Sequence, residues 1–477
     1  LGISVLDYFD LYKKFTYVRQ ESYRLNYIAK VELGESKLDN PYETFKDFYT
    51  KDYQKFVEYN IQDVELVDKL EDKMKLIELC LTMAYEAKVN YTDVYSQVRC
   101  WDTIIYNHLL KKNIMIPPRE EHDKDTQYEG AYVKDPQLGL HNWIVSFDLN
   151  SLYPHLIMQY NLSPETLVGV QPKNMGVENY LNQKFNLQWA RDKNVAVAPN
   201  GSMYRRDKQG FLAELMEKMY GDRVVFKKKT IEAKKEFQKT KDPIYKNEIS
   251  RCNNIQMAKK ISLNSAYGAI GNQYFRYFDV RIAEAITLGG QLAIRWVEND
   301  VNRFMNKLLN TDNVNYVVAS DTDSIYLKLD KLVEKVCKDK SPQQITDFIN
   351  KAAEDKIQKV IDDSFKNLAT YVNAYEQKMF MKREAIANKA IWVAKKRYMM
   401  NVFDEEGIRF DIPKLKIMGV EAVKSSTPEV CRGKIKDAIR VIMNDSEDAL
   451  IKFVADFKEV FKTLSPEEVA FPRSCNY

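Results

Sequence analysis

The fold is decided by WIVSFDLNSLYP at residues 143–154 and NYVVASDTDSIYLKL at residues 315–329. In each stretch a run of apolar, β-prone residues leads to a carboxylate, Asp148 in the first and the DTD turn 321–323 in the second. The pattern predicts a strand that ends at Asp148 and a hairpin with acids at its tip. A single Asp at a turn ordinarily caps that turn, but unpaired charges beside two apolar strands would be costly. We therefore expect the two strand ends to be adjacent.

Asp148 and Asp323 form the kind of pair that a hard divalent cation needs. Mg²⁺ usually takes one or two protein carboxylates and keeps positions free for substrate phosphates. Two such ions about 3.5–4 Å apart can stabilise both the attacking and the leaving oxygen of a phosphoryl displacement. The pair predicts a centre for two Mg²⁺ ions.

A basic segment, residues 218–260, lies between the two acidic stretches. It holds thirteen Lys and Arg against five acids, whereas the whole chain has a net charge of only +4. Helix formers flank the turn KDPIY at 241–245, which predicts two antiparallel helices. We expect the second helix to end at Gly268 and Gly271, with glycine in the left-handed conformation.

The two predicted helices each carry one polar face toward a shared space. Arg223 and Lys227 are four residues apart on the first helix. Residues at spacings of four, four and three share a face of the second: Gln256, Lys260, Asn264 and Tyr267. A triphosphate between these faces would have its charge met by Arg and Lys. Lys227 to Lys229 and most other cations of the segment could instead form a solvated helix face without binding phosphate. We do not apply this alternative to Arg223 and Lys260.

Composition excludes several classes of protein. With 477 residues, 45% hydrophobic and 29% charged, 16 Gly and 14 Pro, the chain is not collagen-like, low-complexity or largely disordered, and its length suits several domains. No apolar run approaches the roughly 18 residues of a membrane span, and no signal segment opens the chain. Six Cys without a C-x-x-C and four His predict neither a disulfide framework nor a zinc site, which favours a reducing, cytoplasmic compartment. Because it opens on Leu1 and closes on AFPRSCNY, we interpret it as a fragment or a processed piece.

Outside these stretches the chain predicts mainly helices. Residues 58–112 and 428–464 have helical periodicity, and residues 116–130 form a charged, Pro-containing linker. One apolar stripe in the first region is expected to be core: Leu66, Leu70, Met74, Ile77 and Leu81.

The motifs resemble a known family. DLNSLYP (148–154), KKISLNSAYG (259–268) and DTDS (321–324) have the order and spacing of the three polymerase motifs of family B DNA polymerases. Other stretches are similar to further elements of that family, in particular as they occur in the replicative polymerases of T-even bacteriophages: GISVLDYFDLYKKF near the start, YNIQD (59–63), YEGAYVKDP (128–136), KKRY (395–398), KIMGVE (416–421) and SSTPE (425–429).

The resemblance covers essentially the whole chain and implies a mixed α/β (α+β) right-hand fold. Its parts would be the C-terminal part of an RNase H-like 3′–5′ exonuclease domain (1–115), a linker (116–140), a palm with a β-sheet (141–210 and 272–425), helical fingers (211–271) and a partial thumb (426–477).

The resemblance also implies roles for individual residues. The catalytic acids would be Asp148 and Asp323, which with the Leu149 carbonyl hold two Mg²⁺ ions, and the auxiliary Asp321; Glu384 would lie near the metals. Nucleotide-binding groups would be Ser151, Leu152 and Tyr153, whose ring would exclude a 2′-hydroxyl, and Arg223, Lys227, Lys260 and Asn264. DNA-binding groups would be Tyr267, Lys395, Lys396, Arg397 and Tyr398. Asp63 would be the one exonuclease metal ligand retained, since the first two exonuclease acid motifs are absent.

Five positions depart from the family pattern. His155 replaces the common Ser after SLYP, and Ala319-Ser320 stands where Tyr-Gly is usual. Ala266 replaces a larger apolar residue, and Lys382 stands where an acid is common. None of these departures removes a catalytic carboxylate.

The expected function is therefore template-directed DNA synthesis on primer-template DNA with deoxynucleoside triphosphates, in the cytoplasm of an infected bacterial host. The alternative is a partner-dependent half of a split or truncated polymerase that binds DNA. Expected partners include a separate exonuclease-domain chain and a sliding clamp, but no membrane. A reverse transcriptase or RNA polymerase is disfavoured by Tyr153 and DTDS.

Overall fold

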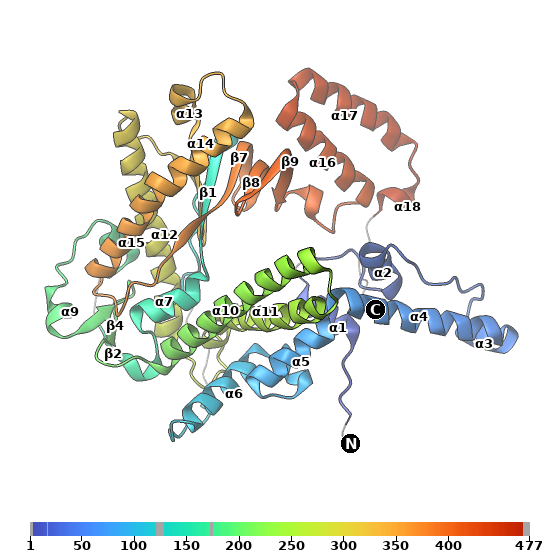
Figure 1. The fold of residues 1–477 in the computed structure, drawn as a ribbon, viewed down its shortest axis with the longest axis horizontal. Coiled ribbons are helices and arrows are strands. Elements are labelled where there is room, and N and C mark those ends of the chain that lie inside the picture. Colours follow the sequence, from blue (N-terminus) through green and yellow to red (C-terminus); the bar gives the residue numbers. More distant parts are fainter. Residues whose placement is uncertain (1–2, 17, 121–127, 172–174, 471–477) are drawn as a thin grey trace.

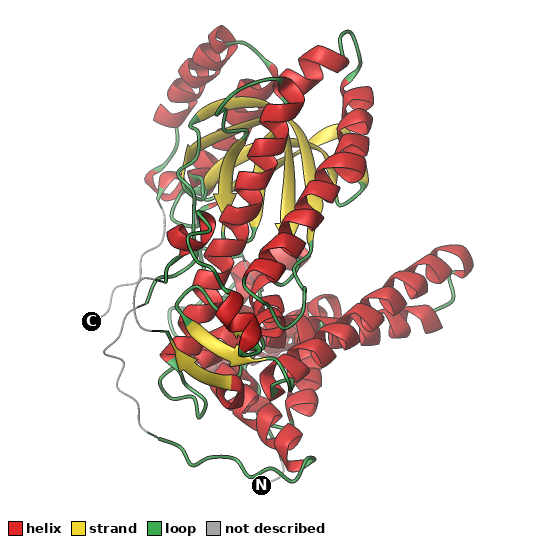
Figure 2. Cartoon of the chain, turned by 90° about the vertical axis from the view of Figure 1, so that its left-hand side faces the viewer, coloured by secondary structure: helices red, strands yellow, loops and turns green. Residues whose placement is uncertain are grey.

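The computed structural model describes residues 3–16, 18–120, 128–171 and 175–470. These residues form a six-stranded sheet, a three-stranded sheet and several groups of helices (Figure 1). Figure 2 shows the larger sheet flanked by helices and the smaller sheet apart from it. The mixed α and β architecture confirms the expected fold class. None of the described helices is both long and apolar enough to cross a membrane.

The larger sheet is antiparallel throughout, with strand order β5-β6-β1-β7-β8-β9. Residues 144–147 of its central strand β1 are all buried, because the sheet is covered on both faces there. The strands of this sheet are β1 (Gly139–Leu149), β5 (Val317–Asp321), β6 (Ser324–Lys328), β7 (Met381–Ala394), β8 (Arg397–Glu405) and β9 (Ile408–Met418). The predicted strand at Asp148 and the predicted acidic hairpin are both confirmed.

Helices pack on one face of this sheet, with α12 against both α15 and β5. They are α7 (Leu152–Tyr160), α12 (Val280–Leu309), α13 (Asp330–Val336), α14 (Pro342–Ala352) and α15 (Gln358–Tyr371), with a π-helical turn at Ala353–Ile357. The other face carries an aromatic cluster of Tyr326, Trp392 and Tyr398. The smaller sheet, β2 (Leu167–Val170), β3 (Val195–Val197) and β4 (Ser202–Arg205), follows α7 together with the helices η2 (Pro164–Thr166), α8 (Val177–Leu181) and α9 (Gln188–Asp192).

The basic segment forms the two predicted antiparallel helices, α10 (Phe211–Thr240) and α11 (Ile244–Ile270). Lys241 turns the chain at a φ of 57°. The prediction that the second helix ends with glycine in the left-handed conformation is wrong. Gly268 lies inside α11, and Gly271 has a φ of −82°. A Cβ at Gly271 would stand 2.6 Å from the Tyr128 hydroxyl oxygen, so close packing calls for glycine there.

The N-terminal part is helical, and α4 and α5 do not share one continuous apolar stripe. Lys75 adopts a φ of 56° and separates them, so Leu66 and Leu70 are buried while Leu81 is 37% exposed. The predicted core stripe is therefore wrong at Leu81, whereas Met74 and Ile77 are partly buried against the core. The elements are α1 (Tyr8–Phe15), α2 (Leu25–Leu33), α3 (Phe45–Lys51), α4 (Tyr53–Met74), α5 (Leu76–Ala87), η1 (Tyr91–Tyr95) and α6 (Gln97–Leu110).

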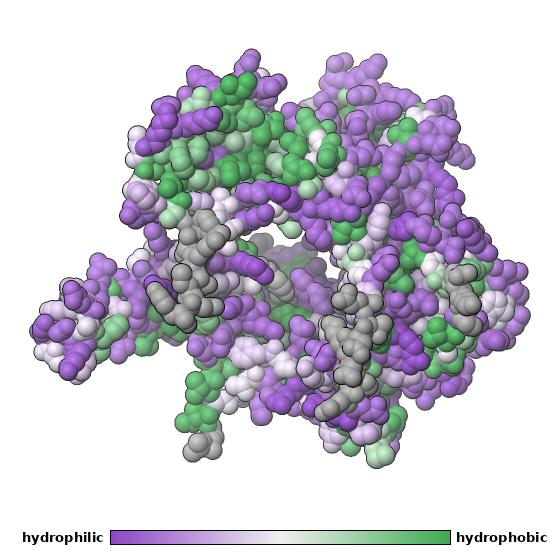
Figure 3. All heavy atoms as spheres, turned by 180° about the vertical axis from the view of Figure 1, so that it is seen from behind, coloured by the Kyte–Doolittle hydropathy of each residue, from purple (hydrophilic) through white to green (hydrophobic). Residues whose placement is uncertain are grey.

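The C-terminal part is also helical, as predicted, with η4 (Glu421–Val423), α16 (Glu429–Asn444), α17 (Glu447–Lys462) and α18 (Pro466–Val469). Residues 116–120 of the predicted linker have no helix or strand, and residues 121–127 lie outside the described residues. Most of the closing AFPRSCNY also lies outside them. Seen from behind, the molecule has a central opening, bordered on this face largely by hydrophilic side chains (Figure 3).

Candidate active site

Asp148 and Asp323 lie on adjacent strands at the same end of the larger sheet. Asp148 is opposite Ser324, and the Leu149 N–H donates to the Asp323 carbonyl oxygen at 2.8 Å. Thr322 between the hairpin acids has a φ of 57°, which makes the turn tight. The structure thus brings the two carboxylates to the edge of one cleft.

Burial and like charge act on both carboxylates. The pKa of Asp148 is raised to about 8, first by burial and then by the charges of Asp323 and Glu384. The pKa of Asp323 is raised to about 6, first by burial and then, against a backbone hydrogen bond, by Asp321 and Glu384. Each negative charge therefore makes the other more costly. A cation between the two would remove this cost.

The oxygen donors at this edge fit a hard divalent cation. Two carboxylates and the Leu149 carbonyl are ligands of the kind that Mg²⁺ takes. Within the described residues, no group of three or more His, Cys, Asp or Glu side chains is arranged to hold a metal. The side chains therefore offer a partial coordination sphere, and the remaining positions fall to backbone, water and substrate oxygens.

Residues 150–151 connect β1 to α7 and are called the β1–α7 turn. Ser151 is left-handed there, with φ 49° and ψ 58°, and its Oγ accepts a hydrogen bond from Arg223 Nη1 at 3.2 Å. This conformation sets the N-terminus of α7 at the cleft, where Leu152 and Tyr153 both line it. The first N–H groups of a helix lack intrahelical partners and favour anions. The turn is thus suited to bind phosphate oxygens.

The cations of the cleft come from α10 and α11. Arg223, Lys227 and Lys260 line a cleft of about 670 Å³ together with the carboxylates, and Gln256 and Asn264 line it too. Lys227, Lys228 and Lys229 are all exposed, as a solvated face requires, but of the three only Lys227 lines the cleft.

Lys259 is next to the cleft residue Lys260 in sequence but has a structural role. It is only 5% exposed, and its Nζ lies 2.8 Å from Glu86 and 3.2 Å from Asp222. A buried charge needs such partners. Lys259 therefore joins α10 and α11 to α5, while Lys260 faces the cleft.

Two tyrosine rings are in contact at one side of the cleft. The rings of Tyr153 and Tyr267 have centroids 4.7 Å apart and planes inclined by 44°. The hydroxyl of Tyr267 donates to that of Tyr128 at 3.3 Å. Burial is the main cause of the raised pKa of Tyr153, so its ring stays neutral. The pair forms an aromatic wall beside the cleft.

The region behind the carboxylates contains acids that the sequence only partly indicates. Glu384 accepts from Ser146 Oγ at 3.1 Å and pairs with Lys416 at 2.6 Å, so its charge is met from behind. Glu406 also lines the cleft, although no sequence pattern singles it out. It stands in the β8–β9 turn, where its N–H donates to the Glu384 carbonyl at 2.7 Å. Asn150, Met257 and Thr322 are further lining residues that sequence reasoning missed.

The KKRY segment occupies the turn between β7 and β8, and its members have different surroundings. Lys395 is paired with Asp135 at 3.0 Å, and Lys396 with Asp321 at 2.7 Å. Both lysines stay about half exposed or more, at 48% and 62%. Tyr398 is buried, 7% exposed, and its hydroxyl lies 2.8 Å from that of Tyr326.

KKRY and KIMGVE come together in space. Arg397 forms an ion pair with Glu421. Gly419 has a φ of 65°, and a Cβ there would stand 2.1 Å from the Lys396 carbonyl oxygen, which excludes any other residue. The two motifs thus form one surface beside Asp321.

Asp63 is separate from this cleft, on α4. Its Oδ2 lies 2.6 Å from Lys37 Nζ, which also stands 4.7 Å from the centre of the Tyr59 ring. Its Oδ1 is buried and has no hydrogen-bond partner among the described residues.

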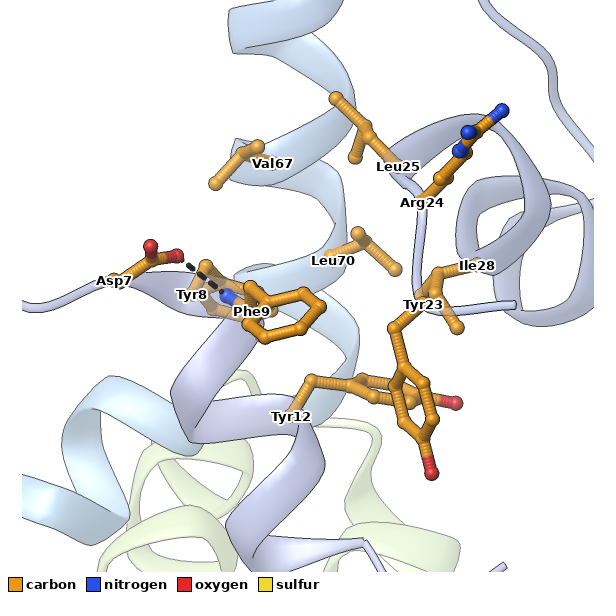
Figure 4. A pocket seen from close by; sticks show the side chains of 10 residues that line it. All are labelled: Asp7, Tyr8, Phe9, Tyr12, Tyr23, Arg24, Leu25, Ile28, Val67 and Leu70. Atoms are coloured by element: carbon orange, nitrogen blue, oxygen red, sulfur yellow. Dashed lines mark hydrogen bonds between the residues drawn. The ribbon is translucent and has the colours of Figure 1, made fainter. Parts of the chain in front are cut away.

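A second cavity, of about 570 Å³, lies between α1, α2 and α4 and is lined mainly by apolar groups. Figure 4 shows the rings of Phe9, Tyr12 and Tyr23 around it. Asp7 there accepts from the Phe9 N–H at 2.9 Å as the cap of α1. This cavity has no pair of carboxylates and does not share residues with the cleft.

Comparison with known proteins gives consistent results. The sequence model of DNA polymerase family B matches residues 89–472. The chain is 35% identical to a DNA-directed DNA polymerase of Escherichia phage RB69 and 33% identical to one of Enterobacteria phage T4, in both cases over 100% of this chain and 58% of the relative. A DNA polymerase delta catalytic subunit of Candida albicans is 27% identical over 64% of this chain and 28% of its own length.

The chain thus spans 58% of the length of the two phage relatives. Its resemblance to T-even phage polymerases, drawn from motifs, is confirmed by these identities. With four fifths of its residues matched by the family's sequence model and its motifs gathered at one cleft, the chain belongs to DNA polymerase family B.

Proposed function

We propose that this chain carries out template-directed DNA synthesis, joining a deoxynucleotide to the 3′-hydroxyl of a primer. One observation supports this above the others: two carboxylates whose pKa values are raised by burial and by neighbouring carboxylates face Arg223, Lys227 and Lys260 across one cleft. Phosphoryl transfer is catalysed mainly by positioning and by electrostatic stabilisation, and these residues supply both.

In this proposal Asp148, Asp323 and the Leu149 carbonyl would hold two Mg²⁺ ions. When bound, the ions would neutralise charge on the attacking and leaving oxygens. Arg223, Lys227 and Lys260 would bind the triphosphate, with the N–H groups that open α7. Asn264 would lie beside the nucleotide.

The ring of Tyr153 would exclude ribonucleotides. It is held against Tyr267 and has little freedom to move away from a 2′-hydroxyl. Tyr267 and the KKRY segment would contact primer-template DNA. Lys395 and Lys396 are exposed enough for direct phosphate contacts, whereas the buried Tyr398 would act by fixing the turn that carries them.

A second role concerns Asp63. Its buried, unpartnered Oδ1 is a single oxygen of the kind that a metal site uses, but one carboxylate does not fix two divalent ions. We therefore propose that 3′–5′ exonuclease activity depends on a further polypeptide that carries the remaining acids. A sliding clamp and the cytoplasm of an infected bacterium belong to the same proposal.

Primer extension by the purified chain tests the proposed DNA synthesis and its partner-dependent alternative. We expect Mg²⁺-dependent addition of template-matched deoxynucleotides. Extension only after an exonuclease-domain polypeptide is added would favour the partner-dependent alternative. No extension in either case, with primer-template DNA still bound, would contradict catalysis by this chain.

A further inference from the structure

His155 on α7 is only 4% exposed and has contacts in two directions. Its Nδ1 lies 2.9 Å from the Ser151 carbonyl oxygen, in the β1–α7 turn. Because a carbonyl can only accept, Nδ1 carries the proton. Burial is the main cause of the lowered pKa of His155, which keeps the imidazole neutral with this single N–H.

The other side of the imidazole contacts α10. Its ring meets that of Tyr220 edge to face, with centroids 4.5 Å apart and planes at 83°. Tyr220 and Arg223 are three residues apart, so both point to the same side of α10. Arg223 in turn donates to Ser151 Oγ. The β1–α7 turn is therefore joined to α10 through both residues.

The start of α10 is fixed independently. The Gly210 N–H donates to Asn161 Oδ1 at 2.7 Å, and a Cβ at Gly210 would stand 2.5 Å from Ser163 Cβ. The contact between His155 and Tyr220 follows roughly three turns later along the helix. The cations Arg223 and Lys227 come directly after it.

We propose that His155 is a positioning residue for nucleotide binding. Its ring holds α10 at Tyr220 and so sets where Arg223 and Lys227 stand relative to the β1–α7 turn. A Ser at this position would be too short to reach Tyr220, so the contact needs the ring of His155. That His155 affects nucleotide binding rests on the proposed function, whereas its contact with Tyr220 does not.

The first test is a double-mutant cycle in primer extension. His155→Ser and Tyr220→Leu should each raise the KM for deoxynucleotides about threefold to tenfold, the range of an aromatic pair, with kcat and primer-template affinity nearly unchanged. The double variant should be no worse than the poorer single variant, because both remove one contact. His155→Phe keeps a ring and should recover most of the loss.

The second test needs no activity. Hydrogen exchange of the backbone amides at 211–227 should become faster in His155→Ser and Tyr220→Leu, while exchange in α12 stays as in the parent. Additive effects in the cycle, a loss confined to kcat, or unchanged exchange in α10 would overturn the proposal. If the parent does not extend primers, the proposed function fails, and the exchange result still decides whether His155 fixes α10.

Discussion

Carboxylates stand at two places where metals are expected, and their surroundings differ. Asp148 and Asp323 face each other across adjacent strands, and neither has an ion pair among the described residues, while burial and like charge raise both pKa values. Asp63 stands alone on a helix, with Lys37 at 2.6 Å. Cations line the cleft opposite the first two carboxylates without forming an ion pair with either of them, whereas Asp63 is already paired with Lys37. Aspartates at the two places therefore differ in how strongly they can bind a cation, because the surrounding charges set the free energy of binding.

The largest expected effect is at the pair. Asp148→Ala or Asp323→Ala should lower primer extension by at least about 10³-fold, since several kcal/mol of charge stabilisation depend on the metals. Primer-template affinity should stay nearly unchanged, because phosphate contacts by cations dominate it. Steady-state extension and anisotropy of a labelled primer measure the two quantities.

Asp437→Ala is the matched control, since Asp437 lies on the exposed side of α16 with Arg440 at 2.7 Å and should have no effect. Asp321→Ala should be milder than either member of the pair. Extension within tenfold of the parent in Asp148→Ala or Asp323→Ala would remove the distinction between the pair and Asp63.

Tyr153→Ala should open the cleft to ribonucleotides. Loss of the ring removes the bulk that a 2′-hydroxyl would meet, so discrimination should fall roughly 10- to 200-fold, the range for one group in a shaped pocket. Competition between ribo- and deoxynucleotides in primer extension gives the ratio. Tyr153→Phe keeps the ring and should keep the parental ratio. A ratio unchanged in Tyr153→Ala would place the filter elsewhere.

Lys260→Ala and Lys396→Ala should show separate effects, the first on nucleotide binding and the second on DNA binding. Lys260 lines the cleft, so its loss should raise the KM for nucleotides about tenfold with little change in DNA affinity. Lys396 lies outside the cleft beside Asp321, so its loss should weaken DNA binding and reduce the salt slope by about 0.9. Lys331→Ala, on the exposed surface of α13, is the control. Equal effects of both variants on both quantities would mean one undifferentiated basic surface.

The raised pKa values predict how stability depends on pH. Asp148 and Asp323 bind protons more tightly when folded, with pKa values of about 8 and about 6 against an ordinary 3.8. This contribution is complete below the ordinary value and is lost as pH rises through 6 and 8. Without divalent cations, the free energy of unfolding should therefore fall over this range.

Mg²⁺ should restore stability at pH 8, and Asp148→Asn should be more stable than the parent there when no Mg²⁺ is present. Denaturant unfolding at several pH values, with Na⁺ at matched ionic strength as control, measures both. A parent that is equally stable at pH 5 and 8 without Mg²⁺ would show that the pair is neutralised by another group.

The smallest effect is expected at Asp63. The purified chain should not shorten a labelled single-stranded primer, and Asp63→Ala should change nothing measurable, because Lys37 and one carboxylate do not form a two-metal site. A polypeptide with the missing acids could restore digestion, and Asp63 would then matter. Mg²⁺-dependent digestion by the chain alone, lost in Asp63→Ala, would show that Asp63 belongs to a working metal site, as proposed for Asp148 and Asp323.

Elements with local sequence signals could be predicted before the structure was known. Apolar runs that end in Asp148 and in the DTD turn indicated the strand and the hairpin, and the 4, 4, 3 spacing on α11 indicated the face toward the cleft. Motif order indicated the family. These features depend on periodicity and turn chemistry within a few residues, which the sequence contains directly.

Which neighbour each face meets depends on tertiary packing. Lys259 and Lys260 are adjacent in sequence, yet Lys259 is buried and pairs with Glu86, whereas Lys260 faces the cleft. Glu406 reaches the cleft through the pairing of β8 with β9, and His155 meets Tyr220 because α7 packs on α10. Such contacts join residues far apart in the chain, and their geometry is set by how whole elements pack, which no local pattern contains.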